Sequence, residues 1–317
     1  MRALRARCTA GLLGLVLLAV SGCASLRQPD EGRRPASLQA RVELTSVPFY
    51  PQEEYQCGPA ALATALQAAG IQRTPGQLAD QVYLPWRQGS LQVELLGATR
   101  RSGAVPYLLR TRMTDLLEEV AAGNPVVVLQ DLGWPMLPRW HYAVVVGYDL
   151  LDRTVTLRSG TTERLLMSLD AFDRSWEKAG RWAVVTVPAD RLPATASEAD
   201  YVEAATALER VVPAQGLRAL RTALQAWPAN LFARLALGNA AYRQRDLAAA
   251  RDHYRQAAAD HPQAGDAWNN LAQVLFEQGQ RAEALRAAQR AVALGGARAG
   301  TYAATLRAIE PAGPLAK

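Results

Sequence analysis

A period of 34 residues in the last third of the chain constrains its fold more than any other feature. Similar residues recur at this offset, and the matching pairs are Leu237 and Leu271, Gly238 and Ala272, Tyr242 and Phe276, Ala250 and Ala284, Ala257 and Ala291, and Pro228 and Pro262. From Ser197 onward the chain is rich in alanine, arginine and leucine and shows no strand pattern. A repeating unit of this size cannot bury its apolar face alone, so neighbouring units must stack. We therefore expect an all-α array here, with a plain helical bundle as the alternative.

This period resembles the tetratricopeptide repeat, in which two antiparallel helices pack small residues against large ones. The resemblance implies a repeat domain over residues 198–312, with a degenerate first repeat from Asp200 to Pro228 and a capping helix from Arg298 to Ile309. It also implies a curved array whose concave face binds peptides or a partner protein. His253 and His261 fall in the array without metal-ligand spacing, and we predict no metal site and no cofactor.

The length of the chain limits the number of domains, and its net charge bears on the kind of partner. The 317 residues allow about two folded domains. The formal net charge is +6, but Arg2, Arg5 and Arg7 lie in a segment that we expect to be removed, which leaves 32 basic and 29 acidic residues, or +3. This small excess is evenly spread and gives no reason to expect nucleic acid binding.

The N-terminus is typical of an export signal. A basic stretch is followed by ten apolar residues from Gly11 to Val20 and by the small residues Ser21 and Gly22. Ten residues are too few to span the ~30 Å hydrocarbon core of a bilayer as a helix. We therefore predict that residues 1–22 are a cleaved signal peptide.

The residues around the cleavage point, Val20 to Cys23, resemble the lipobox of bacterial lipoproteins. The resemblance implies a diacylglycerol on the sulfur of Cys23 and acylation of its new amine, which would anchor the protein firmly to a membrane. An ordinary signal peptide with a chance cysteine is the alternative. Ala24, in place of an aspartate, favours the outer membrane over the inner one, on its periplasmic side. Residues 23–44 are polar and proline-containing, and we expect a flexible tether.

Cysteine usage singles out Cys57. The chain has three cysteines, of which Cys8 leaves with the signal peptide and Cys23 is predicted to be acylated. Cys57 would then be alone in an oxidising compartment with no partner for a disulfide. Such a thiol is either buried and inert or reactive for a purpose.

The surroundings of Cys57 favour a reactive thiol. Pro59 and Gly70 bracket an alanine- and leucine-rich run and predict a helix that starts at about Cys57. The helix N-terminus favours the thiolate, and its free N–H groups can hold an oxyanion. Gln52 can supply a second donor from its side-chain amide. The alternative is a small buried residue on an alanine-rich helix.

A thiol nucleophile needs a base, and His141 is the only histidine before residue 250. It opens a β-branched and aromatic segment that predicts a strand, after a loop rich in tryptophan and proline. We expect an α+β domain built on an antiparallel sheet. The predicted strands are Val126–Gln130, Tyr142–Tyr148, Val155–Arg158 and Trp182–Val187, and the predicted helices are near Gln77–Val82, Leu91–Arg101 and Thr114–Ala122.

The pattern Gln52-x4-Cys57-Gly58-Pro59 before a helix, together with His141 at the start of a strand, resembles the bacteriocin-processing (double-glycine) peptidases, a branch of the papain-like cysteine peptidases. The likeness covers residues 45–188. It implies a papain-like fold with Cys57 as nucleophile, His141 as base, Gln52 as oxyanion donor and a further residue that orients the histidine. The chain lacks the fused transporter of that family, so leader removal coupled to export is not implied.

The orienting residue departs from the family pattern. Asp149 lies eight residues along the strand from His141, or ~26 Å away, and is too far. A hairpin around Leu150 and Leu151 would place Ser159 or Gly160 opposite His141, where the family usually has an aspartate. We predict Ser159 as the orienting residue, with Glu163 as the carboxylate alternative if the register slips.

These observations predict an enzyme, namely a membrane-tethered cysteine peptidase that cuts peptide bonds through an acyl-enzyme. A linker at residues 189–197 would join this peptidase domain to the repeats, which would bind a protein. A catalytically weak scaffold that binds peptides is the first alternative, and a thiol acyl or amide transferase is the second. Trp86, Trp134 and Trp140 could line a substrate groove, although such residues also close the edge of a core.

Overall fold

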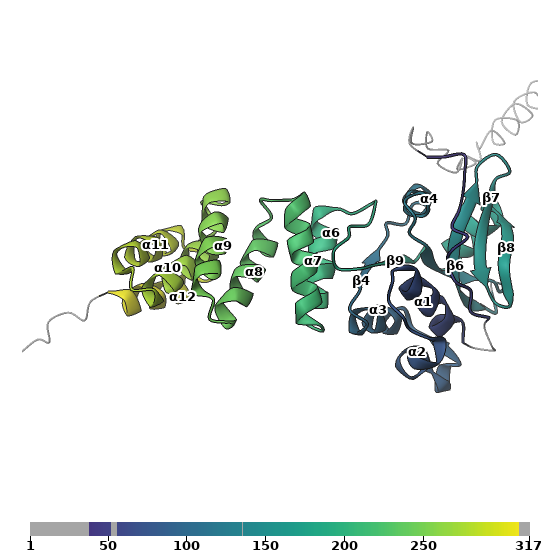
Figure 1. Ribbon diagram of the computed structural model, residues 1–317, viewed down its shortest axis with the longest axis horizontal. Coiled ribbons are helices and arrows are strands. Elements are labelled where there is room, and N and C mark those ends of the chain that lie inside the picture. The colour runs from purple at the N-terminus through teal and green to yellow at the C-terminus, as the bar shows by residue number, and fades with distance from the viewer. Residues whose placement is uncertain (1–37, 52–55, 135, 311–317) are drawn as a thin grey trace, which may run out of the picture. The chain divides into compact units, whose positions relative to one another are not determined.

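The computed structural model describes residues 38–51, 56–134 and 136–310 (Figure 1). The predicted signal peptide, Cys23, most of the tether and Gln52 lie outside these residues and stay predictions. Among the residues described, no helix has the length and apolar character needed to cross a membrane.

A seven-stranded sheet forms the first part of the described chain, with the strand order β4-β9-β5-β6-β7-β8 and with β1 paired to β6. All of these neighbours are antiparallel, as predicted. Four strands match the predicted segments within two residues, whereas β1, β4 and β8 were not predicted. The strands are β1 (Arg41–Glu43), β4 (Val105–Leu108), β5 (Val126–Asp131), β6 (Trp140–Asp149), β7 (Thr154–Ser159), β8 (Thr162–Ser168) and β9 (Ala183–Val187).

Helices cover both faces of this sheet. Val127 and Leu129 of β5 are buried against one set of helices, which comprises α1 (Cys57–Ala68), α2 (Pro75–Val82) and α3 (Gln92–Arg101). Val126 and Val128, which alternate with them, are buried against the opposite set, α4 (Met113–Ala121) and α5 (Leu169–Lys178). Side chains of a strand point alternately to its two faces, so an all-apolar strand such as β5 needs cover on both.

Helix α1 carries Cys57 as its first residue, as predicted. The helix ends where Gly70 adopts a φ of +81° and its N–H donates to the carbonyl of Gln67 (3.0 Å). A glycine in the left-handed region is the usual end of a helix because it has no Cβ to clash. At the other end, Gly58 lets a small ribbon of β2 (Tyr83–Leu84) and β3 (Gly89–Ser90) approach the helix closely.

The rest of the described chain is helical, and its helices repeat at the predicted period. Helices α7, α9 and α11 begin 34 residues apart, as do α8 and α10. Gly238 of α8 lies directly against the ring of Tyr254 in α9, a small residue packed against a large one as expected. The helices are α6 (Glu198–Glu209), α7 (Pro213–Ala226), α8 (Leu231–Arg243), α9 (Leu247–Asp260), α10 (Gly265–Glu277), α11 (Arg281–Leu294) and the predicted capping helix α12 (Ala299–Ile309).

The predicted linker is held by hydrogen bonds to the sheet domain. The buried carboxylate of Glu119 in α4 accepts hydrogen bonds from the N–H groups of Ala194 (3.2 Å) and Thr195 (2.7 Å) and from the hydroxyl of Thr195 (2.6 Å). The amide of Asn124 is a fourth donor to this carboxylate (2.7 Å). A linker fixed at both its backbone and its side chains leaves little freedom for hinge motion.

Candidate active site

Cys57 and His141 lie on one cleft of about 1050 Å³. Cys57 comes from the N-terminus of α1 and His141 from the second position of β6, so the packing of α1 against the sheet brings them to one cleft. Other walls of the cleft come from the β2–β3 ribbon, with Ser90, and from the start of β6, with Trp140. This volume is at about the upper end of the range of ligand-binding clefts in proteins.

The ring of His141 is held by Ser159. Its Nε2 lies 2.8 Å from the hydroxyl Oγ of Ser159, so Nδ1 is the other ring nitrogen that a reaction could use. The turn between β6 and β7 is wider than predicted, since Asp149 pairs with Thr154, and this places the pairing two residues from the predicted register. The irregularity between Val145 and Gly147 reduces the offset to one residue, so that Val144 pairs with Arg158. Ser159 nevertheless reaches the ring from the last position of β7.

The other acidic candidates are placed elsewhere. Asp149 lies at the far end of β6, where its carboxylate pairs with Arg41 and accepts from the N–H of Leu151 (2.9 Å). Glu163 is exposed on β8, and its backbone carbonyl accepts a hydrogen bond from Arg158 (2.7 Å). Among the described residues, Ser159 is therefore the hydrogen-bond partner of the histidine ring.

Burial decides the charge state of the two reactive groups. It raises the pKa of the Cys57 thiol, although backbone N–H groups of Tyr142, Gly58 and Cys57 itself act in the opposite direction. Burial also lowers the pKa of His141 to about 4, with a smaller contribution from the positive charge of Arg139. The N–H groups at the helix N-terminus thus favour the thiolate, as expected, but the loss of solvation is the larger effect. These two shifts favour a neutral thiol and a neutral imidazole at rest.

Sequence reasoning missed Ser90. Its hydroxyl is buried and has no hydrogen-bond partner in the described part of the chain, and it lines the cleft next to Gly58. A single serine in a two-residue strand carries no signal in the sequence, since only the tertiary contact with α1 places it. Of the three tryptophans proposed for a groove, Trp86 and Trp140 line the cleft, whereas Trp134 is not among its lining residues.

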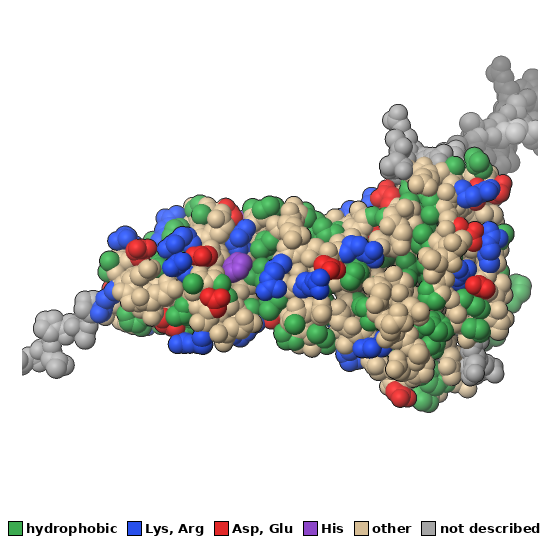
Figure 2. All heavy atoms as spheres, viewed as in Figure 1, with side chains coloured by type: hydrophobic (Ala, Val, Ile, Leu, Met, Phe, Trp, Pro, Cys, Tyr) green, Lys and Arg blue, Asp and Glu red, His purple; other side chains and the backbone are tan. Residues whose placement is uncertain are grey.

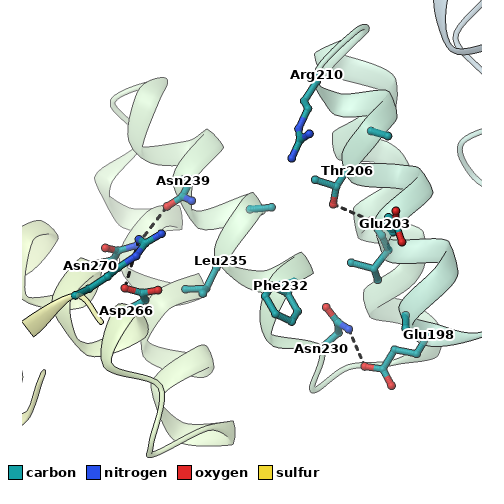
Figure 3. A pocket seen from close by; sticks show the side chains of 15 residues that line it. Glu198, Glu203, Thr206, Arg210, Asn230, Phe232, Leu235, Asn239, Asp266 and Asn270 are labelled. Atoms are coloured by element: carbon teal, nitrogen blue, oxygen red, sulfur yellow. Dashed lines mark hydrogen bonds and ion pairs between the residues drawn. The ribbon is translucent and has the colours of Figure 1, made fainter. Parts of the chain in front are cut away.

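A second hollow, of about 840 Å³, lies along α6, α8 and α10. Phe232 points into it from α8, between that helix and α6 (Figure 3), and 74% of this side chain is exposed. Asn230 donates to Glu198 on one side (2.7 Å), and Asn270 donates to Asn239 on the other (3.3 Å). The hollow therefore offers an unpaired aromatic ring framed by amides.

Positive and negative side chains are interspersed over the visible surface of the helices (Figure 2).

Comparison with known proteins agrees with this division of the chain. The Peptidase_C39 like family matches residues 44–184, and the tetratricopeptide repeat matches residues 207–258 and 235–304. An uncharacterised protein of Methanothermobacter thermautotrophicus is 28% identical over 136 residues, which cover 43% of this chain and 85% of that protein.

Two solved structures are similar to the first domain. A candidate C39-like peptidase from Bacillus anthracis has a TM-score of 0.42 and 19% identity, covering 47% of this chain and 98% of its own. The peptidase domain of Streptococcus ComA, a bi-functional ABC transporter involved in a quorum-sensing pathway, has a TM-score of 0.36 and 20% identity, covering 45% of this chain and 98% of its own. The predicted fold class is confirmed: the chain has a sheet-containing domain that matches the C39-like peptidases, followed by helices that match tetratricopeptide repeats.

Proposed function

We propose that the protein is a cysteine peptidase, with Cys57 as nucleophile and His141 as general base. The observation that carries this proposal is the pair itself: both side chains line one cleft, and Ser159 holds the histidine by its Nε2, which leaves Nδ1 for the thiol. A nucleophile and a base that is oriented by a third group are the elements of thiol catalysis.

The chemistry follows from these positions. Nδ1 of His141 takes the thiol proton as the sulfur of Cys57 attacks the carbonyl carbon of the scissile bond. The resulting oxyanion is stabilised by the N–H at the start of α1 and, as the sequence predicts, by the amide of Gln52. The imidazolium then gives its proton to the leaving amine, which leaves a thioester on Cys57. Water, deprotonated by His141, hydrolyses this thioester and restores the thiol.

The neutral resting pair implies that substrate binding and attack drive the proton transfer, rather than a preformed thiolate. Ser159 is an uncharged orienting group and stabilises the imidazolium less than a carboxylate would. The weaker stabilisation of the imidazolium by Ser159 supports the scaffold alternative, in which the cleft binds peptides without cutting them. Transfer of the acyl group to an amine instead of water uses the same residues and remains the third possibility.

An electrophilic peptide probe, such as a peptide vinyl sulfone, tests the proposal. We expect the wild-type protein to be labelled at Cys57 much faster than the unfolded chain, and Cys57→Ala to abolish labelling. His141→Ala should reduce the rate to that of an ordinary thiol, while Ser159→Ala should reduce it less. Labelling no faster in the folded protein than in the unfolded one would rule out the enzyme; fast labelling without any peptide turnover would favour the scaffold or transferase.

We also propose that the protein is a lipoprotein, anchored through Cys23 on the periplasmic side of a bacterial envelope. In addition, we propose that the second hollow, along α6, α8 and α10, binds a protein partner. The first part is supported by the sequence around Cys23 and the second by the repeats and the exposed Phe232. Membrane fractionation of a Cys23→Ala variant tests the anchor. A variant that stays fully membrane-bound would count against acylation at this residue.

A further inference from the structure

An exposed apolar surface lies beside the mouth of the cleft, on the segment between β5 and β6 and on the first residue of β6. We call this surface the apolar rim; its members are Leu132, Trp134, Met136, Leu137 and Trp140. Met136 is 95% exposed, Trp134 80% and Leu137 73%. The other exposed large apolar side chains of the sheet domain, such as Val93, Leu151 and Leu166, are spread over different elements, whereas those of the rim are contributed by one short segment. Side chains this exposed project from the surface, and clustered apolar groups in water mark an interaction site.

Hydrogen bonds hold the backbone of the described residues of the rim. The carboxylate of Asp131 accepts from the N–H groups of Gly133 and Arg139, both at 2.8 Å. Trp134 and Leu137 exchange two backbone hydrogen bonds, at 3.1 and 2.9 Å. A Cβ at Gly133 would lie 2.2 Å from the carbonyl oxygen of Leu137, so the turn is packed as tightly as a glycine allows. The fold therefore holds these apolar side chains outward instead of letting them collapse.

This closed backbone distinguishes between possible partners. A surface that binds a peptide by strand pairing must present free N–H and C=O groups, and the rim has used most of its own. A surface that enters lipid must instead have its backbone N–H and C=O groups already hydrogen-bonded, because an unpaired backbone group is costly where no water is present. Trp134, Met136 and Leu137 are also not among the residues that line the cleft, so they extend beyond the surface that a bound substrate would cover.

The charges around the rim point to an anionic partner. From Leu132 to Trp140 the sequence contains no acidic residue. Arg139 lies within this segment, and Lys178 from α5 reaches it with a hydrogen bond to the carbonyl of Gly133 (3.1 Å). Arg87 lies over the ring of Trp86 on the other wall of the cleft. Exposed tryptophans flanked by cations are typical of protein surfaces that sit at the headgroup level of a bilayer.

We propose that the apolar rim inserts into the interfacial layer of a lipid bilayer rich in anionic headgroups. Trp140 belongs both to the rim and to the cleft, so this contact would set the mouth of the cleft at the membrane surface. The substrates reached there are polypeptide segments at or near the bilayer. The contact with lipid does not depend on the proposed catalysis, and its test does not measure turnover.

Tryptophan fluorescence with brominated lipids tests the insertion, since bromine quenches only tryptophans that contact the acyl region. The full chain is mixed with vesicles of brominated phosphatidylglycerol or brominated phosphatidylcholine. We expect strong quenching on the anionic vesicles, and a loss of most of it in Trp134→Phe. The part of the quenching that Trp134→Phe removes reports the depth of this one side chain, and an N-terminal lipid anchor alone does not produce it.

Matched variants separate the rim from other exposed residues. Leu137→Ser should lower the quenching at least fivefold, whereas Leu151→Ser, an equally exposed leucine at the opposite end of β6, should leave it unchanged. Arg139→Gln should weaken the response on anionic vesicles and reduce its salt dependence. Thermal melting checks that each variant is folded.

Three outcomes would overturn the proposal. The first is no quenching of the wild-type protein on anionic vesicles. The second is quenching that Leu137→Ser and Trp134→Phe leave intact. The third is a dimer in solution that Leu137→Ser dissociates while quenching is absent, which would make the rim an interface between two copies of the chain.

Discussion

The hydroxyl of Ser159 and the imidazole of His141 form the contact on which the chemistry of the site depends. A serine can fix the ring in a productive orientation but supplies no charge to offset the imidazolium. Burial is the main cause that lowers the pKa of His141 to about 4, with a smaller contribution from Arg139, and burial also raises the pKa of Cys57. The site is thus oriented for catalysis and neutral at rest.

The first prediction concerns Ser159. We expect Ser159→Ala to lower kcat for a peptide substrate by about 10- to 100-fold with little change in KM, because the ring loses its orientation and the peptide keeps its contacts. Ser159→Asp should raise the pKa of His141 and shift the acid limb of the pH profile to higher pH. An equal loss in both variants with an unchanged pH profile would indicate that Ser159 only supports the fold.

The second prediction concerns pH. Because burial raises the pKa of Cys57 and keeps His141 neutral above about pH 4, the free enzyme should contain little thiolate at neutral pH. The rate of alkylation by iodoacetamide should therefore keep rising as pH increases through 8 and 9. A plateau of fast alkylation between pH 5 and 8 would instead reveal a thiolate–imidazolium pair and contradict the neutral resting state.

At the scale of the elements, the sequence predicted those segments whose own residues show a strand or helix pattern without help from tertiary contacts. The valine-rich β5 and β6 and the helix α1, with its proline and glycine ends, were confirmed. The edge strand β4 contains Pro106, and β8 is largely exposed, so neither shows the pattern of a buried strand. Ser159 was found from the hairpin despite a register error, whereas Ser90 could not be, because only packing against α1 places it.

The third prediction concerns the contact of α1 with the β2–β3 ribbon. A Cβ at Gly58 would lie 2.3 Å from Oγ and 2.6 Å from Cβ of Ser90, so Gly58→Ala must displace the ribbon. We expect a loss of about 1–3 kcal/mol in the free energy of unfolding and slower labelling of Cys57. Gly76→Ala in α2, where a Cβ meets nothing within 4 Å, should be neutral or slightly stabilising. Similar melting of the two variants would contradict the close contact.

At the scale of the whole described chain, one buried cluster extends from the sheet into the first helices of the repeats. Val105 and Tyr107 of β4 belong to the same cluster as Tyr201 and Ala205 of α6. The linker is tied down beside this cluster by Glu119. A shared core of this kind makes independent unfolding of the two sides unfavourable.

The fourth prediction tests this connection. Glu119→Ala removes the acceptor of four hydrogen bonds, one from the buried Asn124 and three from the partly buried linker, and we expect a loss of about 1–3 kcal/mol in the free energy of unfolding. Calorimetry should show one transition in the wild-type protein and a separated or broadened one in the variant. Glu118→Ala, at the neighbouring and more exposed position, is the control. Two well-separated transitions already in the wild type would contradict the shared core.

The central claim is that Cys57 forms an acyl-enzyme with the help of His141. Intact-mass measurement of the protein, quenched in acid during turnover of an activated peptide ester, tests it most directly. We predict an added mass equal to the acyl part of the peptide, located on Cys57 by fragmentation. It should be absent in Cys57→Ala and much reduced in His141→Ala. Hydrolysis that continues unchanged in Cys57→Ala, with no adduct in the wild type, would contradict the account.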